Sequence, residues 1–120
     1  MSRARLAALL VAATITAPAL AAKCSPFDFM VSDTSAHEKY GILVVVAKVT
    51  NHGALACGVE VSASSYDKSG SLIDTNNAWP ASIRNIEPGS SVNFTIHLQA
   101  HRRAARFDVL PNDAREWRTR

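Results

Sequence analysis

Tyr66 and Asp67 stand side by side in the stretch ASSYDKSG, ahead of a Lys-Ser-Gly turn. A carboxylate does acid–base or nucleophilic chemistry only when a partner tunes its pKa or a nucleophile lies within reach. No Ser–His or Cys–His arrangement points at Asp67. In a turn, by contrast, an aspartate accepts backbone N–H groups and a glycine such as Gly70 adopts positive φ. We therefore expect a structural turn with the Tyr66 hydroxyl in water, no catalytic residue and no enzymatic activity.

Histidines 37, 52, 97 and 101 are the next candidates for chemistry, as metal ligands. Zinc and copper sites need three or four converging ligands, usually at close spacing. On a strand, His97 and His101 would share a face but lie about 13 Å apart. We expect solvated histidines, with no bound metal and no other cofactor.

The chain begins MSRARLAALLVAATITAPALAA, which has the three parts of a secretory signal peptide. Arg3 and Arg5 precede an apolar run that is short for a membrane span, and Ala19-Leu20-Ala21 resembles a cleavage site. We expect residues 1–21 to be removed and the mature protein to be periplasmic or secreted. A lipoprotein is disfavoured because Lys23, and not a small residue, precedes Cys24.

The mature chain of about 98 residues is one domain. Its only cysteines, Cys24 and Cys57, enter an oxidising compartment, so we expect them to form a disulfide. The closed loop of about 33 residues would stabilise the fold by roughly 3–4 kcal/mol. Without the leader the charge falls from +3 to about +1. Such a balance gives no general case for nucleic-acid binding.

The mature segment shows short runs of alternating apolar and polar residues between turn residues, which is typical of all-β proteins. We predict about seven strands in an immunoglobulin-like antiparallel β-sandwich over residues 22–111, followed by a basic tail over residues 112–120. Ile83 and Ile86 are expected in the core, and residues 33–41 in a loop. The expected strands are residues 27–32, 40–51, 59–67, 71–79, 91–98 and 105–111, with a short one near Ile83.

The order of several short motifs resembles the bacterial FxLYD domain family. The motifs are Ala47-Lys48-Val49-Thr50-Asn51, Val59-Glu60-Val61, Tyr66-Asp67-Lys68-Ser69-Gly70, Ile86-Glu87-Pro88-Gly89 and Phe94. The resemblance covers residues from about 42 to 109. The chain departs from the naming motif, because Ala63 and Ser65 replace its aromatic and leucine, and Ala47 replaces a glycine. The resemblance implies a small extracytoplasmic β-sandwich with no assigned chemistry.

The strand over residues 40–51 is apolar on both faces, although a two-layer sandwich buries only one. Ile42, Val44 and Val46 form the second face. Residues 23–30, the tail with Trp117, or another protein could cover it.

The C-terminal stretch is rich in arginine, and Arg115 and Arg118 flank Trp117 there.

Two functions follow as hypotheses. The first is a non-enzymatic module that binds an envelope protein through a sheet face or strand edge, with Ile42, Val44, Val46, Arg115, Trp117 and Arg118 as candidate partner-binding residues. The alternative is a binder of anionic polysaccharide or of a membrane surface, acting through Trp79, Trp117 and the arginines, since these residue types suit anionic surfaces.

Overall fold

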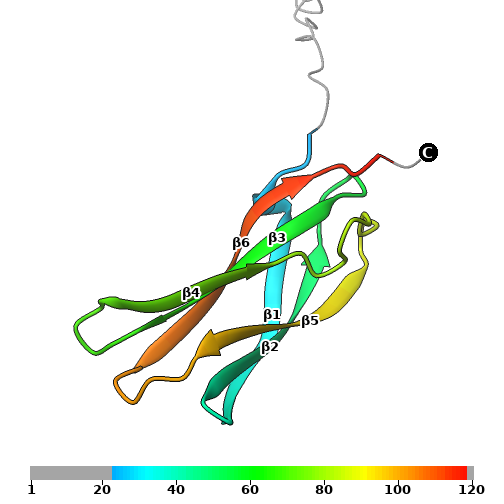
Figure 1. Ribbon diagram of the computed structural model, residues 1–120. Coiled ribbons are helices and arrows are strands. Elements are labelled where there is room, and N and C mark those ends of the chain that lie inside the picture. The colour runs from blue at the N-terminus through cyan, green and yellow to red at the C-terminus, as the bar shows by residue number, and fades with distance from the viewer. Residues whose placement is uncertain (1–22, 119–120) are drawn as a thin grey trace, which may run out of the picture.

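The computed structural model describes residues 23–118, so the predicted signal peptide lies outside the described residues. A short 3₁₀ helix, η1 (Pro26–Asp28), precedes six strands. Figure 1 shows the strands arranged as two layers. The strands are β1 (Phe29–Lys39), β2 (Ile42–Asn51), β3 (Gly58–Tyr66), β4 (Leu72–Ala78), β5 (Ser91–Gln99) and β6 (Arg106–Arg115).

The two layers are antiparallel sheets of three strands each. The first sheet has the order β1-β2-β5 and the second has the order β4-β3-β6. The predicted all-β sandwich is thus confirmed, but with six strands among the described residues. The expected strand near Ile83 does not form, because this segment contributes only the isolated bridge between Cys57 and Ile86. Ile86 is buried as predicted, whereas Ile83 is 70% exposed in a turn beside the buried Ala81.

The core lies between the sheets and follows the alternation of the sequence. On β2, Val45, Ala47 and Val49 face inward, and on β3, Val59, Val61 and Ala63 do the same. Phe94, Ile96 and Leu98 of β5 complete the layer opposite β3. Because side chains alternate across a strand, each inward set leaves a second set on the outer face.

β1 is longer than the sequence predicts. The expected loop over residues 33–41 is mostly strand, since Ser35 to Lys39 pair with β2 beyond an irregularity in register after Ser32. Asp33 has φ 54° there, and its carboxylate lies 3.3 Å from the Lys48 ammonium. Apart from the half-buried Ala36, the residues of this part of β1 are polar and exposed, so the sequence there shows no alternation of apolar and polar residues.

β6 also runs further than expected, to Arg115, four residues past the predicted domain end at Pro111. Pro111 lies where the register with β3 shifts between Glu60 and Val61. Proline lacks an N–H donor and is tolerated in sheets at edges and bulges, both of which apply here. Residues 112–115 are therefore part of the second sheet and not of a tail.

Asn51 organises the connection between β2 and β3. Its side chain is fully buried. The amide nitrogen donates to the carbonyls of Leu55 (2.7 Å) and Ile86 (2.8 Å), and the amide oxygen accepts from the Gly53 N–H (2.8 Å). One side chain thus satisfies three backbone groups from two segments that are far apart in the sequence.

The predicted disulfide between Cys24 and Cys57 is confirmed, with 5.9 Å between the Cα atoms. It lies at the same end of the sandwich as Asn51, because Cys57 pairs with Ile86. We call this the disulfide end. Such a bond fits a protein located outside the cytoplasm.

Three connections lie at the opposite end, which we call the loop end (Figure 1). They are residues 40–41 between β1 and β2, residues 67–71 between β3 and β4, and residues 100–105 between β5 and β6. Backbone hydrogen bonds tie them together: Ala100 donates to Gly41 (3.1 Å) and Ala105 donates to Tyr66 (2.8 Å).

Candidate functional site: the outer face of the first sheet

The candidate residues Ile42, Val44 and Val46 lie in line on the outer face of the first sheet. We call them the β2 strip. The register places His37 and His97 on either side of Val44, and Ser35 and Thr95 on either side of Val46. Lys39 and Gln99 flank Ile42 in the same way. From Ile42 to Val46 the central strand is therefore apolar on this face, while its two neighbours are polar.

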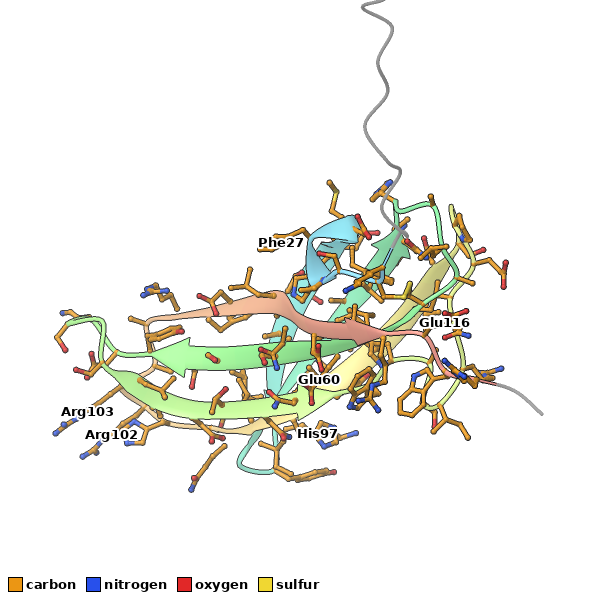
Figure 2. The ribbon with its side chains drawn as sticks, turned by 90° about the horizontal axis from the view of Figure 1, so that it is seen from above. Phe27, Glu60, His97, Arg102, Arg103 and Glu116 are labelled. Atoms are coloured by element: carbon orange, nitrogen blue, oxygen red, sulfur yellow. A yellow bond between two sulfur atoms is a disulfide. The ribbon has the colours of Figure 1, made fainter. Side chains whose placement is uncertain are left out.

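The β2 strip is partly accessible. Ile42 is 39% exposed, and Val44 and Val46 are partly buried by the side chains beside them. A shallow, open hollow of about 320 Å³ lies over Val44 and Ile42, bordered by His37, Lys39, Tyr40 and His97. Figure 2 shows the labelled His97 extending from the ribbon toward solvent. A partner side chain could enter this hollow without moving the backbone.

Within residues 23–118, neither of the two segments that could have covered the β2 strip does so. Cys24 is bonded to Cys57, and Met30 pairs with Thr50, four residues along β2 from Val46. Trp117 also lies at the disulfide end, over Gly58. Since β2 rises about 3.3 Å per residue, Ile42 lies roughly 30 Å from that end.

The candidate residues therefore separate into two places. Trp117 packs edge-on against Trp79 at 5.4 Å between ring centroids. Its backbone N–H and C=O bond to the Asn85 side chain, both at 2.8 Å. The Arg115 guanidinium lies 5.0 Å from the Trp117 ring centroid, and Arg118 is exposed beside it. The tryptophans thus join the C-terminal segment to the domain, and they are not assembled with the β2 strip.

Tyr40 is a feature of the site that the sequence analysis missed. With Gly41 it forms the two-residue connection between β1 and β2, at φ 52° and 78°. Positive φ at both positions is the pattern of a type I′ hairpin turn, in which Asn or Gly is usual. A bulky residue is strained there, yet this tyrosine is 91% exposed at the border of the hollow. Aromatic residues so placed are frequent anchors of protein interfaces.

Asp67 behaves as the sequence predicts, as a turn residue. Its Oδ1 accepts from the Ser69 hydroxyl (2.6 Å) and from the backbone N–H groups of Ser69 (2.9 Å) and Ser71 (3.0 Å). These bonds, led by that from the Ser69 hydroxyl, lower the pKa of the Asp67 carboxyl. Gly70 has φ 89°, as expected for this turn. Tyr66 lies under the Arg106 guanidinium, 4.1 Å from its ring centroid.

His37 and His97 are the only two of the four histidines that flank one residue, Val44. Within residues 23–118 no three or more His, Cys, Asp or Glu side chains gather as a metal site would require. In the same part of the chain, no helix has the length and apolar character needed to cross a membrane.

Comparison of the chain with protein-family models, with curated proteins and with solved structures gave no match.

Proposed function

We propose that this protein is an exported, non-enzymatic binding module that docks a partner protein of the cell envelope on the β2 strip. The residues before Lys23 carry the features of a secretory signal, and the disulfide accords with export, to the periplasm or beyond. The FxLYD-like motifs support the same assignment, as an extracytoplasmic β-sandwich of that kind.

One observation carries the proposal: from Ile42 to Val46, β2 is apolar on its outer face although its inner face already supplies the core. Solvated sheets normally alternate, with polar residues outside. An apolar centre bordered by exposed polar groups is also the composition of a protein interface, with its dry core and polar rim. Tyr40 adds an aromatic anchor at one end of this patch.

The size of the patch sets the kind of binding. The strip from Ile42 to Val46 is about 13 Å long, which is short compared with the interfaces of permanent complexes. We therefore expect a reversible contact and not an obligate assembly. The partner would present an apolar side chain to the hollow over Val44, with polar groups facing the flanking histidines.

The test replaces Val44 with lysine, which places a charge in the centre of the strip. Leu110→Lys is the matched control, because Leu110 is an exposed aliphatic residue (60%) on β6 in the other sheet. Both variants should fold, as measured by circular dichroism and thermal unfolding. A photo-crosslinking residue at Ile42 should capture a defined envelope partner, and Val44→Lys should abolish this capture while Leu110→Lys leaves it intact. Equal capture by all three proteins would refute the proposed surface.

A further inference from the structure

A second surface lies at the loop end, away from the β2 strip. Lys68 of the β3–β4 connection and Arg102 and Arg103 of the β5–β6 connection border an open hollow of about 390 Å³. We call these three residues the basic tip. In Figure 2, the side chains of Arg102 and Arg103 extend into solvent at the end of the molecule opposite Glu116.

The two connections that carry the basic tip are held in place by hydrogen bonds. The Ala105 N–H donates to the Tyr66 carbonyl at 2.8 Å, which joins the β5–β6 connection to the end of β3, next to the β3–β4 connection. His101 accepts from the Arg103 N–H at Nδ1 (3.0 Å) and from the Ala104 N–H at its carbonyl (3.0 Å). The five hydrogen bonds of the Asp67 turn order the other side. The cations are thus presented from a preformed backbone.

Within the described residues, no ion pair neutralises the charges of the basic tip. The ion pairs found within residues 23–118 are Lys48–Asp33 and Arg106–Asp108, and neither involves the basic tip. Asp67 is the one carboxylate at the hollow, and its Oδ1 is directed to Ser69 and Ser71 of its own turn. Residues 23–118 hold 10 basic and 10 acidic side chains, so this cluster is a local feature and not the result of a basic chain.

The lining of the hollow indicates the class of ligand. Besides the three cations, the hollow is lined by Asp67, Ser69 and the small residues Ala104 and Ala105. It lacks a large apolar side chain that could anchor a protein or insert into a lipid bilayer. Arginine, in contrast, binds carboxylate and sulfate groups through paired N–H donors.

We propose that the basic tip binds an acidic polysaccharide, a polymer whose repeated carboxylate or sulfate groups bridge Lys68, Arg102 and Arg103. This activity goes beyond the docking of a protein on the β2 strip and does not depend on it, because no residue of the strip borders the hollow.

The experiment measures binding of the full mature chain to heparin, as a sulfated probe, and to polygalacturonate, as a carboxylated one, with neutral dextran as the blank. The variant Arg102→Gln/Arg103→Gln removes two cations of the tip. Lys23→Gln/Arg84→Gln is the matched control, since both of its cations are exposed and lie toward the disulfide end. Lys68→Gln is measured as well, so that the test stands even if the double variant fails to fold.

We expect binding to at least one acidic polymer, weakened by added salt because the contact is electrostatic. The tip variant should bind about tenfold or more weakly, as two charge-assisted contacts are lost, and Lys68→Gln should show a smaller loss. The control should bind like the unmodified chain. No binding to either polymer at about 50 mM salt, or an equal loss in the control, would overturn the proposal. Tighter binding to anionic lipid vesicles than to both polymers would also overturn it, in favour of a membrane ligand.

Discussion

Asn51→Ala is the substitution whose effect can be worked out most fully. It removes the only side chain that satisfies the Leu55 and Ile86 carbonyls and the Gly53 N–H together. The Ile86 carbonyl also accepts from the Cys57 N–H at 3.2 Å, so it loses one of its two hydrogen bonds. Each of the three hydrogen bonds lost from the buried amide costs about 0.5–1.5 kcal/mol.

The expected total is about 2–4 kcal/mol, a large fraction of the roughly 5–15 kcal/mol that stabilises a small domain. It corresponds to a fall in Tm of about 10–25 °C. The measurement is urea and thermal unfolding of the oxidised protein, followed by circular dichroism. Asn93→Ala, an exposed asparagine on β5, is the control and should change the free energy of unfolding by less than about 0.5 kcal/mol.

A second variant separates hydrogen bonding from packing volume. Asn51→Asp has nearly the same shape, but at neutral pH it directs a carboxylate oxygen at two carbonyl oxygens. If hydrogen bonds matter, Asn51→Asp is at least as destabilising as Asn51→Ala at pH 7. An alanine variant within about 1 kcal/mol of the unmodified protein, or an aspartate variant of unchanged stability, would refute the role given to Asn51.

Two further predictions concern the turn and the tryptophans. Asp67→Asn should destabilise the protein at pH 7. The pKa of Asp67 in the folded protein lies below its unfolded value of about 3.9, because the turn binds the charged carboxylate. The stabilisation by Asp67 is therefore complete above the unfolded pKa and is lost as the pH falls through the folded pKa. Denaturation curves of the two proteins should therefore converge in acid, and a constant difference would contradict the assignment. Gly58→Ala should displace Trp117, since an added Cβ would overlap its indole nitrogen. The tryptophan fluorescence spectrum should shift, and the free energy of unfolding should fall by about 1–3 kcal/mol. An unchanged spectrum would show that Gly58 and Trp117 are not in close contact.

Much of the fold could be predicted from local patterns. Val45 and Val61 face the core because apolar side chains alternate with polar ones along their strands, and this periodicity is visible in the sequence. The Asp67 turn and the Cys24–Cys57 bond were also predictable. The turn depends on neighbouring residues, and the bond depends on a count of two cysteines together with an export signal.

Other features escaped prediction because they depend on contacts between distant residues. The far half of β1 is an exposed strand without apolar alternation, so only its pairing with β2 makes it a strand. Ile83 and Ile86 look equivalent in the sequence, but only Ile86 reaches Cys57 and the Asn51 amide. Tyr40 resembled the first residue of a strand, and its place in a two-residue turn follows from the register of β1 against β2.

The sequence by itself determined the all-β class, the inward faces of the strands, the disulfide and the apolar outer face of β2. These properties follow from side-chain alternation and composition, which are local. Only the tertiary structure decided that Trp117 packs on Trp79, away from the β2 strip, and that Lys68 meets Arg102 and Arg103 at one hollow. The physical reason is that strand order and register, set by the packing of the whole core, bring together residues that lie far apart along the chain.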